Sequence, residues 1–166
     1  MGRLEGTTAV ITGASSGIGR AAYALAREGC NLVLVARREE RLTEVKKKCE
    51  ELGGSTVYYV GDVRCEQTAQ AAVELAVSTF GKVDILINNA GIGKKITLEE
   101  STAENYREIM DTNAFSSFIF SKYAILDMLK RNEGRIVMVS SVTGHIGHAD
   151  ETIYTMTKFA QRGLLQ

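Results

Sequence analysis

Short runs of apolar, mostly β-branched residues recur along this 166-residue chain, and longer amphipathic stretches separate them. Each run is continuous, as is typical of strands that are buried on both faces of a parallel sheet. The pattern predicts five strands, over 8–12, 31–36, 56–61, 84–87 and 135–140. Because helical stretches lie between them, the order predicts a doubly wound α/β fold with right-handed crossovers.

The stretches between the strands have the period of amphipathic helices. Apolar residues within 42–52 and within 73–80 step by three or four positions, which places them on one helix face. A longer helix is predicted over about 101–131, where Ser101 and Glu104 have the spacing of a capping box.

Composition narrows the class of protein. Acidic and basic residues cancel, with 20 of each, so neither a nucleic acid nor a membrane is favoured as a partner. Cys30, Cys49 and Cys65 lack metal-ligand spacing, and no apolar run approaches transmembrane length. No linker or repeat interrupts the chain. We therefore expect one reduced, metal-free domain over 1–166, located in the cytoplasm.

A glycine-rich loop follows the first strand. It contains Gly13, Gly17 and Gly19, before a helix that is predicted to begin near Ile18. Glycines allow the backbone to turn tightly and to approach a pyrophosphate, and ligands of open α/β sheets bind beyond the carboxyl ends of the strands. The spacing alone also fits an ordinary glycine-rich turn. Its position after the first strand favours phosphate binding.

The end of the second strand bears on the choice of dinucleotide. NAD-binding sheets tend to have a carboxylate there, for the ribose 2′-hydroxyl. This chain has Arg37 and Arg38 instead, and guanidinium groups suit a 2′-phosphate. The two arginines also fit a solvated, basic helix start. Given a dinucleotide site, the sequence favours NADP(H) over NAD(H).

A tyrosine and a lysine lie one helical turn apart near the C-terminus. The helix predicted to begin between 150 and 152 carries Tyr154 and Lys158. A lysine ammonium at this distance stabilises a phenolate, so Tyr154 can exchange a proton with a carbonyl oxygen. Ser140 and Ser141 end the fifth predicted strand and can hydrogen-bond a developing oxyanion. Chance produces this tyrosine–lysine spacing often, so the other motifs are needed.

Together these motifs resemble the short-chain dehydrogenase/reductase family, in its single-domain branch. The resemblance rests on TGxxxGxG, an Asp after the third strand, NNAG after the fourth, an Asn in the next helix, and a Ser thirteen residues before YxxxK. It extends over nearly the whole chain. It implies a Rossmann-type sheet in the order 3-2-1-4-5, and NAD(P)-dependent interconversion of a small-molecule carbonyl and a secondary alcohol. It also implies a homo-oligomer.

The resemblance implies a role for each matching residue. Tyr154 would be the acid/base, Lys158 would stabilise the tyrosinate and hold the nicotinamide ribose, and Ser141 would polarise the carbonyl. Asn113, which on sequence alone also fits a solvent-facing helix position, would anchor through its backbone a water that relays protons to Lys158. The residues implied in cofactor binding are Gly13, Ser15, Ser16, Gly17, Ile18, Gly19, Arg37, Arg38, Asp62, Val63, Asn89, Ala90, Gly91, Tyr154 and Lys158.

The family continues beyond this point with two further strands and a substrate lid, so we expect the sheet to lack the family's last strands. Residues 136–139 would then form an apolar sheet edge, which is a hazard for aggregation. Two functions stay open. The chain can be an NADP(H)-dependent oxidoreductase, alone or within a longer product, or a truncated, inactive nucleotide-binding or interaction module that pairs with a full-length relative.

Overall fold

The five predicted strands form one sheet in the computed structural model, which describes residues 2–166. All neighbours are parallel and their order is β3-β2-β1-β4-β5, which confirms the predicted topology. The strands are β1 (Thr8–Thr12), β2 (Asn31–Ala36), β3 (Thr56–Val60), β4 (Ile85–Asn88) and β5 (Arg135–Met138). The predicted bounds of β3, β4 and β5 were wrong by one or two residues.

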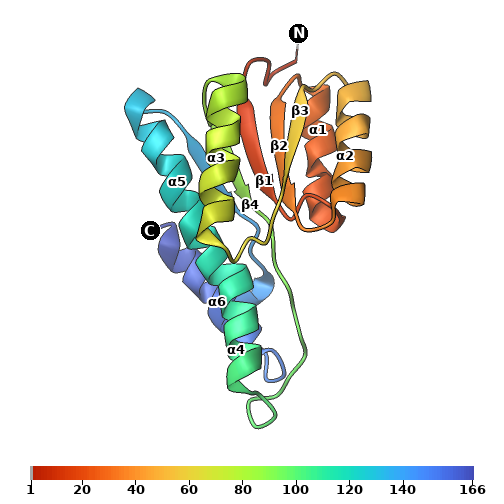
Figure 1. Ribbon diagram of the computed structural model, residues 1–166. Coiled ribbons are helices and arrows are strands. Elements are labelled where there is room, and N and C mark those ends of the chain that lie inside the picture. The colour runs from red at the N-terminus through yellow and green to blue at the C-terminus, as the bar shows by residue number, and fades with distance from the viewer. Residues whose placement is uncertain (1) are drawn as a thin grey trace.

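Helices cover both faces of the sheet (Figure 1). One face carries α1 (Ala22–Arg27) and α2 (Glu39–Glu51), and the other carries α3 (Glu66–Phe80) and α5 (Ser116–Arg131). Alternate residues of each central strand enter different cores: Val10 packs in the core under α3 and α5, and Ile11 in the core under α1 and α2. Because both faces are buried, these strands read as continuous apolar runs.

The helix predicted over 101–131 is two α-helices joined by a π-helical turn. α4 (Ala103–Met110) leads into the turn Asp111–Phe115, and α5 follows. The predicted capping pair was also wrong. Thr102 accepts the Asn105 N–H at 3.1 Å and Asn105 accepts the Thr102 N–H at 3.2 Å, whereas the Ser101 hydroxyl donates to the Thr97 carbonyl.

An extension projects from the sheet at the carboxyl ends of its strands. It contains α4, the loop that precedes α4, and the start of α6 (Thr152–Leu164), which packs against α4 and the π-helical turn (Figure 1). The predicted start of this last helix is confirmed. A parallel bridge between Ile96 and Glu151 ties the loop before α4 to the start of α6. A cleft lies between the sheet and this extension.

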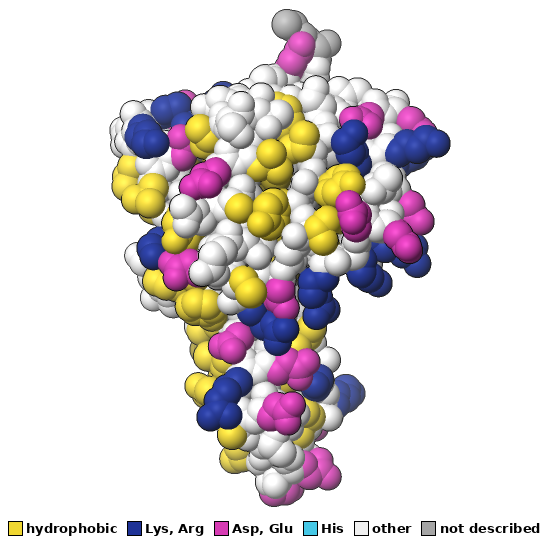
Figure 2. Space-filling model, in the orientation of Figure 1, with side chains coloured by type: hydrophobic (Ala, Val, Ile, Leu, Met, Phe, Trp, Pro, Cys, Tyr) yellow, Lys and Arg dark blue, Asp and Glu magenta, His cyan; other side chains and the backbone are white. Residues whose placement is uncertain are grey.

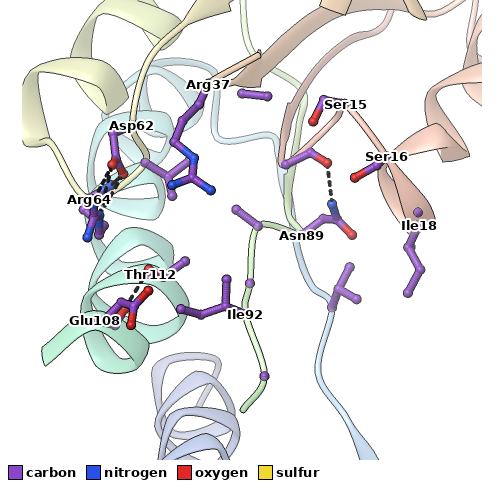
Figure 3. Close-up of a pocket in the computed structure, with 18 of the residues that line it drawn as sticks. Ser15, Ser16, Ile18, Arg37, Asp62, Arg64, Asn89, Ile92, Glu108 and Thr112 are labelled. Atoms are coloured by element: carbon purple, nitrogen blue, oxygen red, sulfur yellow. Dashed lines mark hydrogen bonds and ion pairs between the residues drawn. The ribbon is translucent and has the colours of Figure 1, made fainter. Parts of the chain in front are cut away.

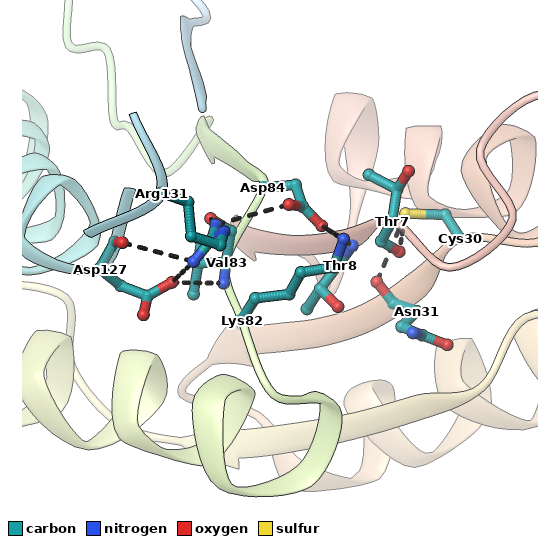
Figure 4. A network of polar contacts seen from close by, with 9 residues as sticks. All are labelled: Thr7, Thr8, Cys30, Asn31, Lys82, Val83, Asp84, Asp127 and Arg131. Atoms are coloured by element: carbon teal, nitrogen blue, oxygen red, sulfur yellow. Dashed lines mark hydrogen bonds and ion pairs between the residues drawn. The ribbon is translucent and has the colours of Figure 1, made fainter. Parts of the chain in front are cut away.

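A polar network holds the opposite edge, where β1 and β4 begin (Figure 4). Asp84 accepts the Thr8 N–H at 2.8 Å and pairs with Lys82 at 3.1 Å. Asp127, on α5, accepts the Val83 N–H at 2.9 Å and pairs with Arg131, whose guanidinium also reaches Asp84 at 3.5 Å. These contacts join α5 to the start of β4.

β5 is an edge strand, as predicted. Val137 is 44% exposed, while its neighbours Ile136, Met138 and Val139 are half-buried, so the apolar edge is narrower than expected. Apolar side chains also gather along the left side of the molecule, over α5 (Figure 2). The exposed apolar residues of α5 are Phe118, Ile125, Leu126 and Leu129.

Candidate functional site

A cleft of about 760 Å³ opens at the carboxyl ends of the strands (Figure 3). It is bordered by the loops after β1, β2, β3 and β4 and by the start of α6. The predicted cofactor-binding residues that line it are Gly13, Ser15, Ser16, Gly17, Ile18, Arg37, Arg38, Asp62, Val63, Asn89, Ala90, Gly91, Tyr154 and Lys158. Three other predicted site residues do not line this cleft: Gly19, Asn113 and Ser141. Their positions are described below.

The loop after β1 needs its glycines. Gly13 and Gly17 have φ angles of 65° and 56°, a region that only glycine adopts readily. A Cβ on Gly13 would lie 2.8 Å from the Ala90 Cα, and a Cβ on Gly19 would overlap the Gly13 carbonyl. The helix predicted to begin near Ile18 is instead a 3₁₀ turn, Gly17–Ala21, before the short α1.

Asn89 connects the loop after β4 to the end of β1 through hydrogen bonds. Its side-chain amide donates to the carbonyls of Thr12 at 2.9 Å and Gly13 at 3.2 Å. The Thr12 hydroxyl accepts the N–H groups of Asn89 and Ala90, each at 3.0 Å. The side chain of Asn89 therefore holds the floor of the cleft, and sequence reasoning missed Thr12 as its partner.

Basic side chains gather at the end of the cleft beside β2. Arg38 donates to the hydroxyls of Ser15 at 3.1 Å and Ser16 at 3.2 Å, and Arg37 extends into the cleft (Figure 3). β2 ends at Ala36, and the two residues that directly follow it are Arg37 and Arg38, not a carboxylate.

Asp62, which follows β3, is held by a nearby arginine. Arg64 donates to both of its carboxylate oxygens, at 2.6 to 3.0 Å. These hydrogen bonds lower the pKa of the Asp62 carboxyl, against the effect of its partial burial. Asp62 is therefore ionised at neutral pH, and Arg64 lies at the cleft wall with part of its charge balanced.

Tyr154 and Lys158 meet at the other end of the cleft. Tyr154 is in the first turn of α6, as predicted. The Lys158 Nζ lies 5.3 Å from the centre of the Tyr154 ring and donates to the Val139 carbonyl at 2.9 Å. Lys158 is only 4% exposed, and burial lowers its pKa to about 8. At pH 7 the ammonium form still predominates.

Asn113 is fully buried in the π-helical turn, so the solvent-facing alternative was wrong. Its amide donates to the Ile92 carbonyl at 2.8 Å and to the Thr157 hydroxyl at 3.1 Å, and its oxygen accepts the Ile92 N–H at 2.8 Å. Thr157 in turn donates to the Tyr154 carbonyl at 2.7 Å. The Asn113 side chain thus joins the loop after β4 to the helix that carries Tyr154.

The two serines after β5 take different positions. Ser140 borders the large cleft. Ser141 borders, together with Tyr154, a second cavity of about 620 Å³, and its hydroxyl accepts the Thr143 N–H at 3.3 Å. Tyr154 therefore borders both cavities, whereas Ser141 borders only the second.

Sequence reasoning missed Gln161, which is 1% exposed and bonds to both Lys158 and Asn113. The available signal was its spacing: Gln161 lies seven residues after Tyr154, on the same helix face. Within residues 2–166, no three His, Cys, Asp or Glu side chains gather closely enough to hold a metal ion. None of the helices in that range is long and apolar enough to span a membrane.

Comparisons with known proteins give the following matches. A family model described as short chain dehydrogenase matches residues 7–166. An uncharacterized oxidoreductase of Thermotoga maritima is 38% identical over 161 residues, and oxidoreductase UcpA of Salmonella typhimurium is 40% identical over 169. The matches cover 96% and 99% of this chain but only 63% of each relative, so the chain spans slightly less than two-thirds of their length.

Solved structures give the same result for the fold. The crystal structure of an NAD+-bound xylitol dehydrogenase superposes with a TM-score of 0.93 at 30% sequence identity. The match covers 98% of this chain and 63% of that one.

Proposed function

Because this chain belongs to the short-chain dehydrogenase family, we propose that it carries the cofactor-binding and catalytic residues of an NADP(H)-dependent oxidoreductase. The reaction is the interconversion of a small-molecule carbonyl and a secondary alcohol. The whole chain, 1–166, acts as one dinucleotide-binding domain. The observation that carries the proposal is the cleft, which brings the glycine loop and the Tyr154–Lys158 pair to one site.

The residues of the cleft fit a dinucleotide. Gly13 and Gly17 line it without side chains, and such a backbone surface suits close approach of a pyrophosphate. Asp62 and Val63 would contact the adenine, and Lys158 the nicotinamide ribose. When bound, the nicotinamide supplies or accepts the hydride.

The preference for NADP(H) rests on the two arginines after β2. Arg38 donates to the Ser15 hydroxyl, Arg37 lines the same cleft, and neither of the two residues that directly follow β2 is a carboxylate. A guanidinium group suits a 2′-phosphate, which a carboxylate would repel. The solved relative described as NAD+-bound lends no support to this preference, so it depends on the arginines of this chain.

Tyr154 is the proposed acid/base. Its position at the border of both cavities suits proton exchange with a carbonyl oxygen in the cavity bordered by Ser141, whose hydroxyl would stabilise the developing charge on that oxygen. The Lys158 Nζ lies over the Tyr154 ring, 5.3 Å from its centre, beside the proposed site of proton exchange. Asn113 holds the helix that carries both residues in place.

A second function is favoured by the exposed apolar surface. Val137 on the β5 edge and the apolar residues of α5 described above are the type of surface through which a sheet or helix pairs with another chain. An inactive nucleotide-binding module that associates with a second copy or a longer relative would use this surface. It would bind the cofactor without turnover.

The cofactor proposal is tested by titrating the purified chain with NADPH and with NADH, following nicotinamide fluorescence. We expect saturable binding that is tighter for NADPH. Arg37→Glu should weaken NADPH binding by about 1.5–3 kcal/mol, because it replaces a charge-assisted hydrogen bond with repulsion, and should spare NADH. The matched control is Arg41→Glu, on α2 but outside the cleft. Equal losses for both cofactors would show that Arg37 is structural.

The acid/base proposal is tested with Tyr154→Phe. This change should abolish carbonyl reduction, because the proton donor is removed, and should leave NADPH affinity within a few-fold. Turnover is measured with a panel of carbonyl substrates, on the chain or on a longer product that contains it, with Tyr106→Phe on the exposed face of α4 as control. Turnover that survives in Tyr154→Phe would remove Tyr154 from this role.

A further inference from the structure

Gln161 is a buried polar residue next to the proposed catalytic pair. It lies on the same face of α6 as Tyr154 and Lys158, and it is 1% exposed. A buried carboxamide is destabilising unless its donors and acceptor are matched. The partners of Gln161 therefore indicate what the residue does.

The side chain of Gln161 bridges Lys158 and the π-helical turn. Its Oε1 accepts from the Lys158 Nζ at 3.0 Å. Its Nε2 donates to the Asn113 carbonyl at 3.0 Å and to the Ser117 hydroxyl at 2.9 Å, and that hydroxyl donates to the same carbonyl at 2.8 Å.

This network leaves one orientation for the amide. With the amide reversed, the NH₂ group would face the ammonium and the oxygen would face the Asn113 carbonyl. A donor would then face a donor, and an acceptor would face an acceptor. The observed orientation satisfies the carbonyl oxygen and both amide hydrogens. It also presents an acceptor to the lysine, which favours its charged form.

The donors of Lys158 can be counted. A lysine ammonium has three N–H groups, and two of them go to the Val139 carbonyl and the Gln161 Oε1. One N–H is left. Because Lys158 borders the cleft and its Nζ faces the Tyr154 ring, this last N–H is available on the cofactor side.

We propose that Gln161 is a positioning residue: its carboxamide clamps the Lys158 Nζ to the π-helical turn, so that the one remaining N–H is presented to the cleft in front of Tyr154. The link between Asn113 and Lys158 then runs through a side chain of α6. This inference rests on the proposed function for its catalytic meaning. The clamp itself exists in the cofactor-free chain and can be measured there.

The test is an NMR titration of Lys158 in the cofactor-free, full 166-residue chain labelled with ¹³Cε-lysine. Lys158→Arg identifies the signal by removing it. In the unsubstituted chain the midpoint is expected near pH 8, because burial lowers the pKa of Lys158. Gln161→Met keeps the volume but removes the acceptor, so the midpoint should fall by about one pH unit. Gln161→Glu adds a negative charge and should raise it by about one unit or more.

Controls separate the clamp from a general effect on folding. Gln70→Met changes a glutamine of α3 that hydrogen-bonds Glu74, and it should leave the midpoint unchanged. Thermal unfolding is recorded for every variant. A purely structural Gln161 predicts a lower unfolding temperature with an unchanged midpoint in Gln161→Met, and that result would overturn the proposal. If Gln161→Met does not fold, Gln161→Leu, which also lacks the acceptor, takes its place with the same two outcomes.

The outcome is independent of the cofactor proposal. A chain that fails to bind NADPH can still show the two opposite shifts of the Lys158 midpoint. That result would support Gln161 as a clamp on Lys158 and contradict the proposed function. A chain that binds NADPH without those shifts would keep the proposed function and remove Gln161 from it.

Discussion

At the scale of single residues, the charged form of Lys158 serves the proposed chemistry, but burying that charge destabilises the folded chain. Burial lowers its pKa from an ordinary value of 10.5 to about 8. Between these values the unfolded chain binds the proton and the folded chain releases it, so stability rises with pH. Below pH 8 the folded state holds a buried cation, which costs about 3 kcal/mol for a shift of this size.

This linkage predicts a pH-dependent stability that Lys158→Met should abolish. From pH 7 to 8.5 the unsubstituted chain should gain about 1 kcal/mol of unfolding free energy relative to the variant, as measured by urea denaturation. The range stays below pH 9 because burial raises the pKa of Cys30 to about 12 and of Cys49 to about 11, so unfolding would ionise these thiols at higher pH. Parallel pH curves for the two proteins would contradict the prediction.

The same scale shows what sequence can reveal about a site. Tyr154 and Lys158 were identifiable because their relation is local, one turn of a helix. Gln161 was not, because its role depends on the Asn113 carbonyl, 48 residues earlier in the chain. Asn113 itself was identified as a site residue, but its burial follows from a packed partner helix that periodicity cannot reveal.

At the scale of elements, the polar network at the start of β4 attaches α5 to the sheet. Burial alone would raise the pKa of the Asp127 carboxyl, but hydrogen bonds from Arg131 and from the Val83 N–H lower it instead. Asp127→Ala should destabilise the chain by about 2–4 kcal/mol, because it leaves the buried Val83 N–H unmatched and removes the closest carboxylate of the Arg131 guanidinium. Chemical denaturation measures the loss.

An exposed pair provides the comparison for Asp127. Glu50→Ala removes an ion pair with Lys46 on the surface of α2 and should change the unfolding free energy by less than about 0.5 kcal/mol. Similar losses in the two variants would mean that the network contributes no more than a surface pair.

Elements also differ in how well their bounds follow from sequence. The strands were found because burial on both faces requires apolar residues at every position. The interruption of the long helix was missed because the π-helical turn Asp111–Phe115 lies within an uninterrupted helical segment. Its cause is tertiary: Asn113 and Ser117 bond to α6 and to the loop after β4.

At the scale of the whole molecule, topology accounts for most of the site. Strand order and parallel direction bring the loops after β1, β2, β3 and β4 to one edge, so residues from distant segments meet without any long-range signal in the sequence. The strand order does not determine the shape of the second cavity, because its walls come from the irregular segments around Gly93 and His148.

The open side of β5 has a consequence for how selectivity could vary. The segment after β5 passes the large cleft at Ser140 and reaches the second cavity at Ser141, and a further strand laid parallel to β5 would end at the same edge of the sheet. The loop after such a strand would lie near that cavity, while Arg37 follows β2 on the other side of the central strand β1. The shape of the accepted molecule could then diverge while the choice of cofactor stays the same.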